Sequence, residues 1–288
     1  MSLPIVKFPT YNTELGNDKI KFRNFNIEEH KSLLTAVELG DTESTFDTMV
    51  NIIKSCTFGK VDIEKLNQGQ LEYLFLQIYI KSVKNKVEAN FTCHQTYDKL
   101  EKVLNEETGE EEELTVNEYC GNEFKIVIPV EKAELKSQSE SKEPISNKIK
   151  VFENIEIDIN YPSAIQRNEI EKESMKLADE ISEDESLDEE VRNQKLTDIK
   201  NEIDVKLIYL FIQSIKDLET DEVFDKSSPD FTYEKFKEWY KTLPSNVIDE
   251  IVNFIQNEPV LSLDYSVKCP KCKKTTKLEF RELQSFFV

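Results

Sequence analysis

Two cysteines in the C-terminal stretch LSLDYSVKCPKCKKTTKLEF constrain the fold of this chain more than any other feature. Cys269 and Cys272 are separated by two residues and lie between two runs that alternate apolar and polar side chains. Such alternation is typical of half-buried strands, so the segment predicts a strand, a tight turn and a second strand. A Cys-x-x-Cys turn of this kind supplies two of the four thiolates of a structural zinc site. The other two ligands must then come from elsewhere in the chain.

A second pair of cysteines, Cys93 and Cys120, is flanked by two further alternating runs in the same register. The side chains of one face lie six, four and two residues before the first cysteine, and four, six and eight residues after the second. In the two units these positions hold Val87, Ala89, Phe91, Phe124, Ile126 and Ile128, and Leu263, Tyr265, Val267, Thr276, Leu278 and Phe280. Because side chains alternate between the faces of a strand, a shared register presents both cysteine pairs alike.

We therefore predict that Cys93, Cys120, Cys269 and Cys272 bind one Zn²⁺ through four thiolates. Such a site has no open coordination position, so its role would be structural, tying the two halves of the chain together. The 26 residues between Cys93 and Cys120 far exceed the usual spacing of one metal knuckle. Two alternatives stay open: His94 replaces one ligand, or only the C-terminal pair forms a turn.

The chain is strongly acidic, and this limits its partners. Its 57 Asp and Glu residues against 37 Lys and Arg give a formal net charge of −20 over 288 residues. This charge argues against general affinity for nucleic acid or an anionic membrane, and it suits a basic partner. The longest apolar run, LEYLFLQIYI, is too short to span a bilayer, and the N-terminus lacks a signal-peptide pattern. We expect a cytosolic chain with reduced cysteines.

The pattern along the chain predicts an α+β fold. Helical N-terminal and middle segments surround short antiparallel strands, with a zinc-ribbon-like pair of cysteine hairpins. We predict an N-terminal α+β domain over residues 1–135, which carries the first cysteine hairpin and an exposed acidic insertion at 95–119. A linker at 136–148 precedes a mainly helical domain at 149–258. The C-terminal cysteine ribbon, 259–288, packs back on the first hairpin.

Several local patterns locate the expected helices. Apolar residues at helical spacing predict three helices in the N-terminal domain, two of which stop near Gly40 and Gly59. The sequence SLDE, from Ser186 to Glu189, has the pattern of a capping box and predicts the start of a middle helix. The apolar stripe expected at the end of that helix consists of Ile203, Leu207, Leu210, Phe211 and Ile215.

Signatures of catalysis are scarce. The two histidines, His30 and His94, lie in no metalloprotease or nucleophile motif, and the six glycines are scattered singly. The CPKC segment joins two strands, whereas a redox Cys-x-x-Cys belongs at a helix N-terminus, where the dipole lowers the thiol pKa. The fifth cysteine, Cys56, lies on a helical apolar face and is expected in the core. The sequence therefore predicts a non-enzymatic protein.

Basic residues around the C-terminal knuckle give an alternative interpretation. The five lysines are Lys268, Lys271, Lys273, Lys274 and Lys277. They resemble those of zinc ribbons in nucleic-acid-binding or transcription accessory proteins, which is the alternative function. The net charge and the lack of aromatic side chains among the lysines argue against it. We expect the lysines to offset the charge of the thiolates and of the acidic insertion.

The order of elements resembles the baseplate hub assembly protein family of T-even-like contractile-tailed bacteriophages. The segments that carry the resemblance are LPIVKFPTYNTEL, IKFRNFNIEEHKSLLTAVELGD, IIKSC, LEYLFLQIYIKSV, the strand that ends in Cys93, IEIDINYPS and the closing CxxC ribbon followed by LQSFF. They cover the N-terminal 130 residues and the closing ribbon, and the middle only in outline. The insertion between Cys93 and Cys120, and Lys273 where a ribbon commonly has Gly, depart from the pattern.

The resemblance implies a non-enzymatic structural or assembly protein of a baseplate hub. Such a protein acts as an adaptor or chaperone for hub, tape-measure or other tail proteins, with no nucleic-acid partner and no membrane span. Its expected location is the virion tail baseplate or an assembly intermediate in the host cytoplasm. A homo-oligomer within the tail assembly is compatible with this role.

Overall fold

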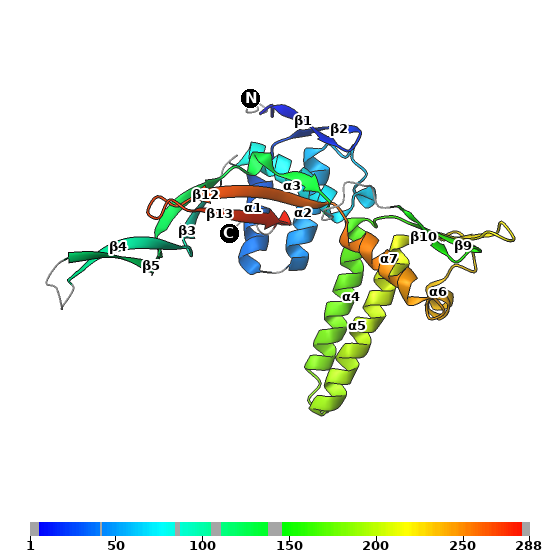
Figure 1. The fold of residues 1–288 in the computed structure, drawn as a ribbon. Helices are drawn as coiled ribbons and strands as arrows, with labels where there is room; N and C mark the ends of the chain where they lie inside the picture. Colours follow the sequence, from blue (N-terminus) through cyan, green and yellow to red (C-terminus); the bar gives the residue numbers. More distant parts are fainter. Residues whose placement is uncertain (1–5, 41, 84–86, 105–110, 138–145, 284–288) are drawn as a thin grey trace, which may run out of the picture.

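The N-terminal part of the chain packs three helices against a β-hairpin (Figure 1). The computed structural model describes residues 6–40, 42–83, 87–104, 111–137 and 146–283. Strands β1 (Thr10–Leu15) and β2 (Asp18–Arg23) pair in antiparallel, and helices α1 (Ile27–Leu39), α2 (Thr42–Cys56) and α3 (Gln68–Ser82) follow. The three helices predicted from apolar spacing are confirmed. Helix α1 ends at Gly40, whose φ of 66° is left-handed and favours glycine.

Helix α3 lies at the centre of this part and is apolar on nearly all sides, as expected for a helix that is buried all round. One set of its side chains, Leu71, Leu74, Phe75 and Ile78, packs with α1, α2 and the β1–β2 hairpin. Its other side chains, Leu76 and Ile80, belong to a second core beneath the cysteine hairpins. Helix α3 therefore joins the N-terminal core to the strands that carry the cysteines.

The described strands around the cysteines form three antiparallel sheets. Strand β3 (Val87–Thr92) pairs with β6 (Glu123–Ile128), and β4 (Thr96–Leu104) pairs with β5 (Glu111–Tyr119). The C-terminal strands β12 (Val260–Lys268) and β13 (Thr275–Arg281) pair with each other, and β12 also pairs with β7 (Glu134–Lys136). A short 3₁₀ helix, η2 (Val130–Lys132), lies between β6 and β7, and another, η1 (Ile63–Lys65), precedes α3. The end of the chain thus returns to its N-terminal part.

The middle of the chain has its own core, built on a four-stranded antiparallel sheet in the order β11-β10-β9-β8. The sheet consists of β8 (Lys148–Val151), β9 (Ile155–Ile159), β10 (Ile212–Asp217) and β11 (Val223–Asp225). Helices α6 (Tyr233–Tyr240) and α7 (Ser245–Gln256) cover it. The prediction that Ile215 belongs to the apolar stripe of the middle helix is wrong, because α5 ends at Phe211 and Ile215 lies in β10. This segment contains β-branched Ile212 and Ile215, and its pairing with β9 makes it a strand.

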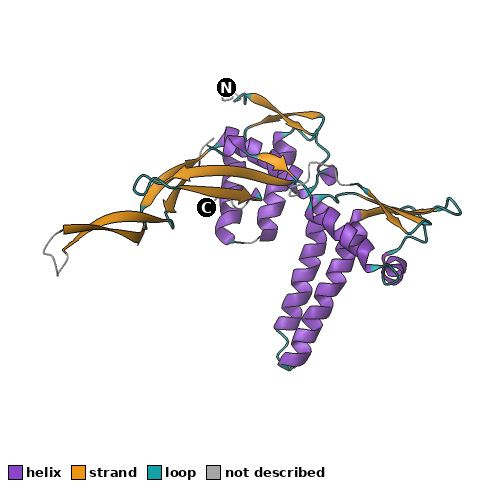
Figure 2. Ribbon diagram, viewed as in Figure 1, coloured by secondary structure: helices purple, strands orange, loops and turns teal. Residues whose placement is uncertain are grey.

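Two elements project from the body in different directions: the β4–β5 ribbon and the hairpin of α4 (Ala164–Ser182) and α5 (Glu189–Phe211) (Figures 1 and 2). The capping box predicted at Ser186 is wrong. The N-cap of α5 is Asp188, which accepts from the Val191 amide, while the Ser186 hydroxyl donates to Asp184. Among the described residues, true capping boxes open three other helices, at Asn26 with Glu29, Asn67 with Gln70, and Ser163 with Gln166. No helix in the described ranges is both long and apolar enough to cross a bilayer.

The start of α4 makes close polar contacts both with the segment before β12 and with the N-terminal part. Arg167 forms an ion pair of 2.7 Å with Glu258, whose side chain is only 6% exposed. The Ala164 amide donates to the Leu66 carbonyl at 2.8 Å. At the start of α3, a Cβ atom on Gly69 would lie 2.2 Å from the carbonyl oxygen of Pro259. The absence of a side chain at Gly69 is therefore what permits this approach.

Candidate metal centre

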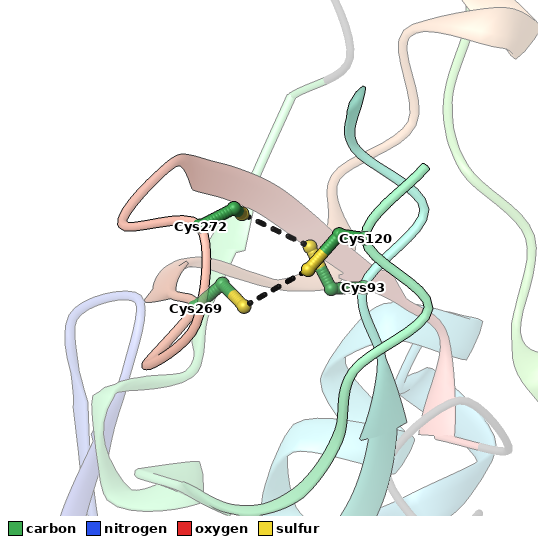
Figure 3. Close-up of side chains that lie close together, drawn as sticks. All are labelled: Cys93, Cys120, Cys269 and Cys272. Atoms are coloured by element: carbon green, nitrogen blue, oxygen red, sulfur yellow. Dashed lines mark hydrogen bonds between the residues drawn. The ribbon is translucent and has the colours of Figure 1, made fainter. Parts of the chain in front are cut away.

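The C-terminal cysteine pair forms a tight turn between β12 and β13. The Cys269 amide donates to the carbonyl of Lys274 at 2.9 Å, and the Lys273 amide donates to the carbonyl of Cys269 at 3.1 Å. Lys273 has a φ of 62°, in the left-handed region. Cys272 lies in this turn, and its sulfur is directed toward Cys93 of the opposite hairpin (Figure 3).

The N-terminal pair repeats this backbone pattern although 26 residues separate its cysteines. The Cys93 amide donates to the carbonyl of Asn122 at 2.9 Å, and the Gly121 amide donates to the carbonyl of Cys93 at 3.1 Å. Gly121, with a φ of 56°, occupies the position that Lys273 holds in the other turn. The Cys120 amide also donates to the carbonyl of Gln95 at 2.9 Å, which closes the base of the β4–β5 ribbon. The β4–β5 ribbon is therefore an insertion between the two cysteines of a knuckle whose backbone hydrogen bonds match those of the C-terminal one.

The strands below the two knuckles pair in the register expected from the sequence. The facing pairs are Val87 with Ile128, Ala89 with Ile126, Phe91 with Phe124, Leu263 with Phe280, Tyr265 with Leu278, and Val267 with Thr276. Side chains of both hairpins, together with η2 and α3, form one hydrophobic cluster. This shared core holds the two hairpins together and brings their cysteine ends to one place.

The four cysteine sulfurs converge between the knuckles and lie within 4.8 Å of one another (Figure 3). The sulfurs of Cys93 and Cys272 are 3.6 Å apart, and those of Cys120 and Cys269 are also 3.6 Å apart. Both distances are far longer than the S–S bond of about 2.05 Å, so these are free thiols. A tetrahedral zinc with Zn–S bonds of about 2.3 Å separates its sulfurs by about 3.8 Å. The donor set and its spacing therefore fit a four-thiolate zinc ion.

The surroundings of the cluster favour thiolates at some positions. Cys93, Cys120 and Cys269 are buried, and Cys272 is half-buried. Burial opposes ionisation of Cys269, but the amides of Cys272 and Lys271 donate to its sulfur and lower its pKa to about 6. The amide side chain of Asn122 also approaches that sulfur, at 3.8 Å. Such N–H···S contacts are the expected second shell of a metal-bound thiolate.

At Cys93, the same cluster opposes ionisation of the thiol. The amide of Gln95 lowers its pKa, but burial and the three neighbouring cysteine sulfurs raise it overall, to about 12. Several thiolates cannot share one buried space unless a positive charge compensates them. A divalent cation at the centre of the four sulfurs would supply that charge.

Two alternatives raised by the sequence can be compared with this geometry. His94 is exposed, and its Nδ1 lies 2.7 Å from the hydroxyl of Tyr119, so it takes no part in the described cluster. Cys269 and Cys272 lie in a strand–turn–strand unit, where no helix dipole acts on the thiols. Cys56 is buried in the N-terminal core, as expected, and there it also contacts Arg23 at 3.6 Å.

One knuckle lysine contacts the base of the ribbon. Lys271 donates to the carbonyl of Cys120 at 3.0 Å, lies 3.9 Å from the carboxylate of Glu118, and stands over the ring of Tyr97. It therefore connects the C-terminal knuckle to both strands of the ribbon. Sequence patterns gave no signal for this bond or for the contact of Asn122 with the Cys269 sulfur, because both depend on the two knuckles facing each other. They also missed Gly121, whose role emerges only once the pairing of β3 with β6 brings Cys93 and Cys120 together.

A family model described as "T4 bacteriophage base plate protein" matches residues 8–288 of this chain. Neither the curated proteins nor the solved structures gave a significant match.

Proposed function

The chain belongs to the family of T4 bacteriophage base plate proteins, and from this membership we propose that it is an adaptor or assembly chaperone of a baseplate hub. The family assigns it a structural role in the baseplate of a phage tail, where it contacts other tail proteins. We propose hub or tape-measure proteins as those partners, and a non-enzymatic role. It would act in an assembly intermediate in the host cytoplasm as well as in the finished virion, and copies of the chain can associate within the tail.

The observation that carries this proposal is the projecting β4–β5 ribbon (Figure 1). Its two strands pair only with each other among the described residues, so both outer edges present free backbone groups. A two-stranded ribbon alone is marginally stable in water, and free edges are the usual place for a partner strand to add. Leu100 and Tyr119, which are 64% and 53% exposed, supply apolar contact area on the ribbon.

The charge of the ribbon indicates the chemistry of the partner. Residues 94–119 contain nine Asp and Glu residues against Lys99 and Lys102. A basic surface or a basic edge strand on another tail protein would complement this segment. The overall charge of −20 acts in the same direction and would speed association with such a surface.

We propose that the four cysteines bind zinc and that the metal fixes this ribbon to the body. Cys93 and Cys120 stand at the points where the ribbon leaves and returns, and Cys269 and Cys272 come from the opposite hairpin. Binding of all four thiolates would hold the ribbon at one orientation to β12 and β13. An adaptor benefits from this because a pre-oriented docking element loses less entropy on binding.

A single replacement tests the role of the ribbon. Substituting the dipeptide Pro-Lys for residues 94–119 would convert the first knuckle into a copy of the second. We expect this variant to fold and to keep its metal, because the knuckle and the strands below it are retained. In a phage that depends on the plasmid-supplied protein, it should give no complete baseplates in sucrose gradients, and tail proteins should no longer co-purify with it.

Two other results would count against the proposal. Normal baseplates from the Pro-Lys variant would show that the ribbon is dispensable for assembly. Retention of DNA or RNA by the intact protein, lost as salt is raised, would favour the nucleic-acid-binding alternative. A second variant replaces only Leu100 and Val116 with Ser, which keeps the ribbon and its charge but removes exposed apolar area. It should keep its metal and retain fewer tail proteins on co-purification.

A further inference from the structure

A groove of about 580 Å³ opens on the helical face of the N-terminal part, away from the cysteines. Its floor is apolar: Leu33, Met49 and Phe75 are buried there, from α1, α2 and α3. On its rim, Leu34 and Val37 of α1 are 48% and 59% exposed. Exposed apolar side chains that surround a hollow of this size mark a binding surface.

The C-terminal end of the described chain enters this groove. Strand β13 ends at Arg281, and Glu282 then adopts a left-handed φ of 61°, which turns the chain out of the sheet. Leu283 lines the groove, and its amide donates to the carboxylate of Glu72 at 2.8 Å. Glu72 is itself 6% exposed and also accepts from Gln68 at 2.6 Å. This anchor fixes Leu283 at one end of the groove.

The opposite end of the groove is marked by His30 and Tyr79. Both rings lie against Phe25, with centroid distances of 5.5 and 6.3 Å. Glu72 and Tyr79 are seven residues apart on α3, a distance of about 10 Å along the helix axis. Five residues in extended form reach about 17 Å, so residues 284–288 are long enough to run the length of the groove.

The chemistry of these residues matches the groove. The segment reads QSFFV, with no Asp or Glu, and ends in two phenylalanines and a valine. The groove lining carries Glu72 and Glu171 and, among the described residues, no Lys or Arg. It would therefore repel an acidic occupant and accept an apolar one.

We propose that the C-terminal residues Phe286, Phe287 and Val288 of this chain fill the groove between α1, α2 and α3 of the same molecule. The groove is then the docking site of residues 286–288, and Glu72 is the group that fixes where this segment enters. The apolar rim of α1 is covered by the tail.

Photo-crosslinking in the full chain tests this placement. Benzoylphenylalanine at position 287 should link to peptides of α1 or α2 within the same chain, as read by mass spectrometry. The control carries the same group at Leu100 on the β4–β5 ribbon and should give no such link. Covalent dimers, or the absence of any link to α1, α2 or α3 from positions 286 and 287, would overturn the proposal.

A binding experiment gives an independent readout. A fluorescent peptide with the sequence of residues 281–288 should bind the Phe286→Ser/Phe287→Ser double variant at least tenfold more tightly than the parent chain. The reason is that the attached tail of the parent competes at a high effective concentration. Adding Val37→Glu on the groove rim to the double variant should abolish peptide binding. Equal binding to the parent and to the double variant would show that the tail does not occupy the groove.

Discussion

Gly121 and Lys273 occupy equivalent positions in the two cysteine knuckles, each one residue after the second cysteine of its pair. Their φ angles are 56° and 62°, and the amide of each donates to the carbonyl of the first cysteine at 3.1 Å. One position has glycine, the residue suited to this conformation, and the other has a side chain that resists it. The same backbone shape is therefore achieved at different conformational cost in the two halves of the site.

The first prediction follows from this difference. Lys273→Gly should raise the free energy of unfolding of the metal-bound protein by about 0.5 to 1 kcal/mol, because it removes left-handed strain. Gly121→Ala should lower it by about 1 to 2 kcal/mol, and its Cβ would also lie 3.2 Å from the Tyr119 ring. Urea denaturation measures both. Lys274→Gly, at a neighbouring position outside the left-handed set, is the control and should not stabilise.

The second prediction concerns metal content. Mass spectrometry of the purified protein should find one zinc per chain, and Cys93→Ser and Cys269→Ser should each lose it, because both hairpins supply ligands. Cys56→Ser should keep the metal, since that thiol lies in a different core. Loss of zinc only from the Cys269 variant would contradict the four-cysteine site. Loss of zinc from His94→Ala would show that the histidine is one of the ligands. Iron in place of zinc would change the metal but not the ligands.

The third prediction is a pH dependence at the start of α1. Burial alone would raise the pKa of Glu29, but hydrogen bonds from Arg23, Ser55 and the Asn26 amide lower it to about 2. A carboxyl with a depressed pKa stabilises the fold above its ordinary value near 4.5, and this contribution is lost as pH falls from there toward 2. Glu29→Gln should therefore cost about 1 to 2 kcal/mol at pH 7, after allowance for solvent screening.

The measurement is the difference in unfolding free energy between parent and Glu29→Gln at pH 7, 5 and 3. We expect the difference to shrink between pH 5 and pH 3. Any acid-induced loss of metal affects both proteins and cancels in the difference. A constant difference across this range would mean that the ionised carboxylate does not stabilise the cap.

The fourth prediction concerns the junction between α3 and the segment before β12. Gly→Ala within a helix usually stabilises a protein by up to about 1 kcal/mol. Gly69→Ala should instead destabilise it by 2 kcal/mol or more, on the order of a strongly overpacked core, because the new Cβ would meet the Pro259 carbonyl oxygen. Thermal denaturation gives the sign directly. A higher melting temperature would show that the two segments can separate at little cost.

The sequence was informative where a short-range period determines the structure. Alternation with period two predicted that the hairpins of Cys93 and Cys269 share a register, and the pairing of Phe91 with Phe124 and of Val267 with Thr276 agrees. The same rule could not predict the contacts between the knuckles, such as Lys271 with the Cys120 carbonyl, because these depend on how two distant hairpins face each other.

Local patterns failed where two interpretations compete within a few residues. Ser186 and Asp188 are both good N-caps, and a turn that engages Ser186 with Asp184 leaves the cap to Asp188. The change from α5 to β10 after Phe211 has no Gly or Pro to mark it, and pairing with β9 decides it. The groove beside Leu283 was likewise invisible in the sequence, since its lining comes from four separate helices.

The β4–β5 ribbon is inserted between Cys93 and Cys120 without interrupting the knuckle that these cysteines form. The two ends of the ribbon are fixed by hydrogen bonds of 2.9 Å, between Cys93 and Asn122 and between Cys120 and Gln95. Whatever joins those ends can lengthen, shorten or change its sequence while the cores below stay intact. If this segment is the docking element proposed above, a foreign hairpin grafted between the same two ends should redirect the protein to a new partner.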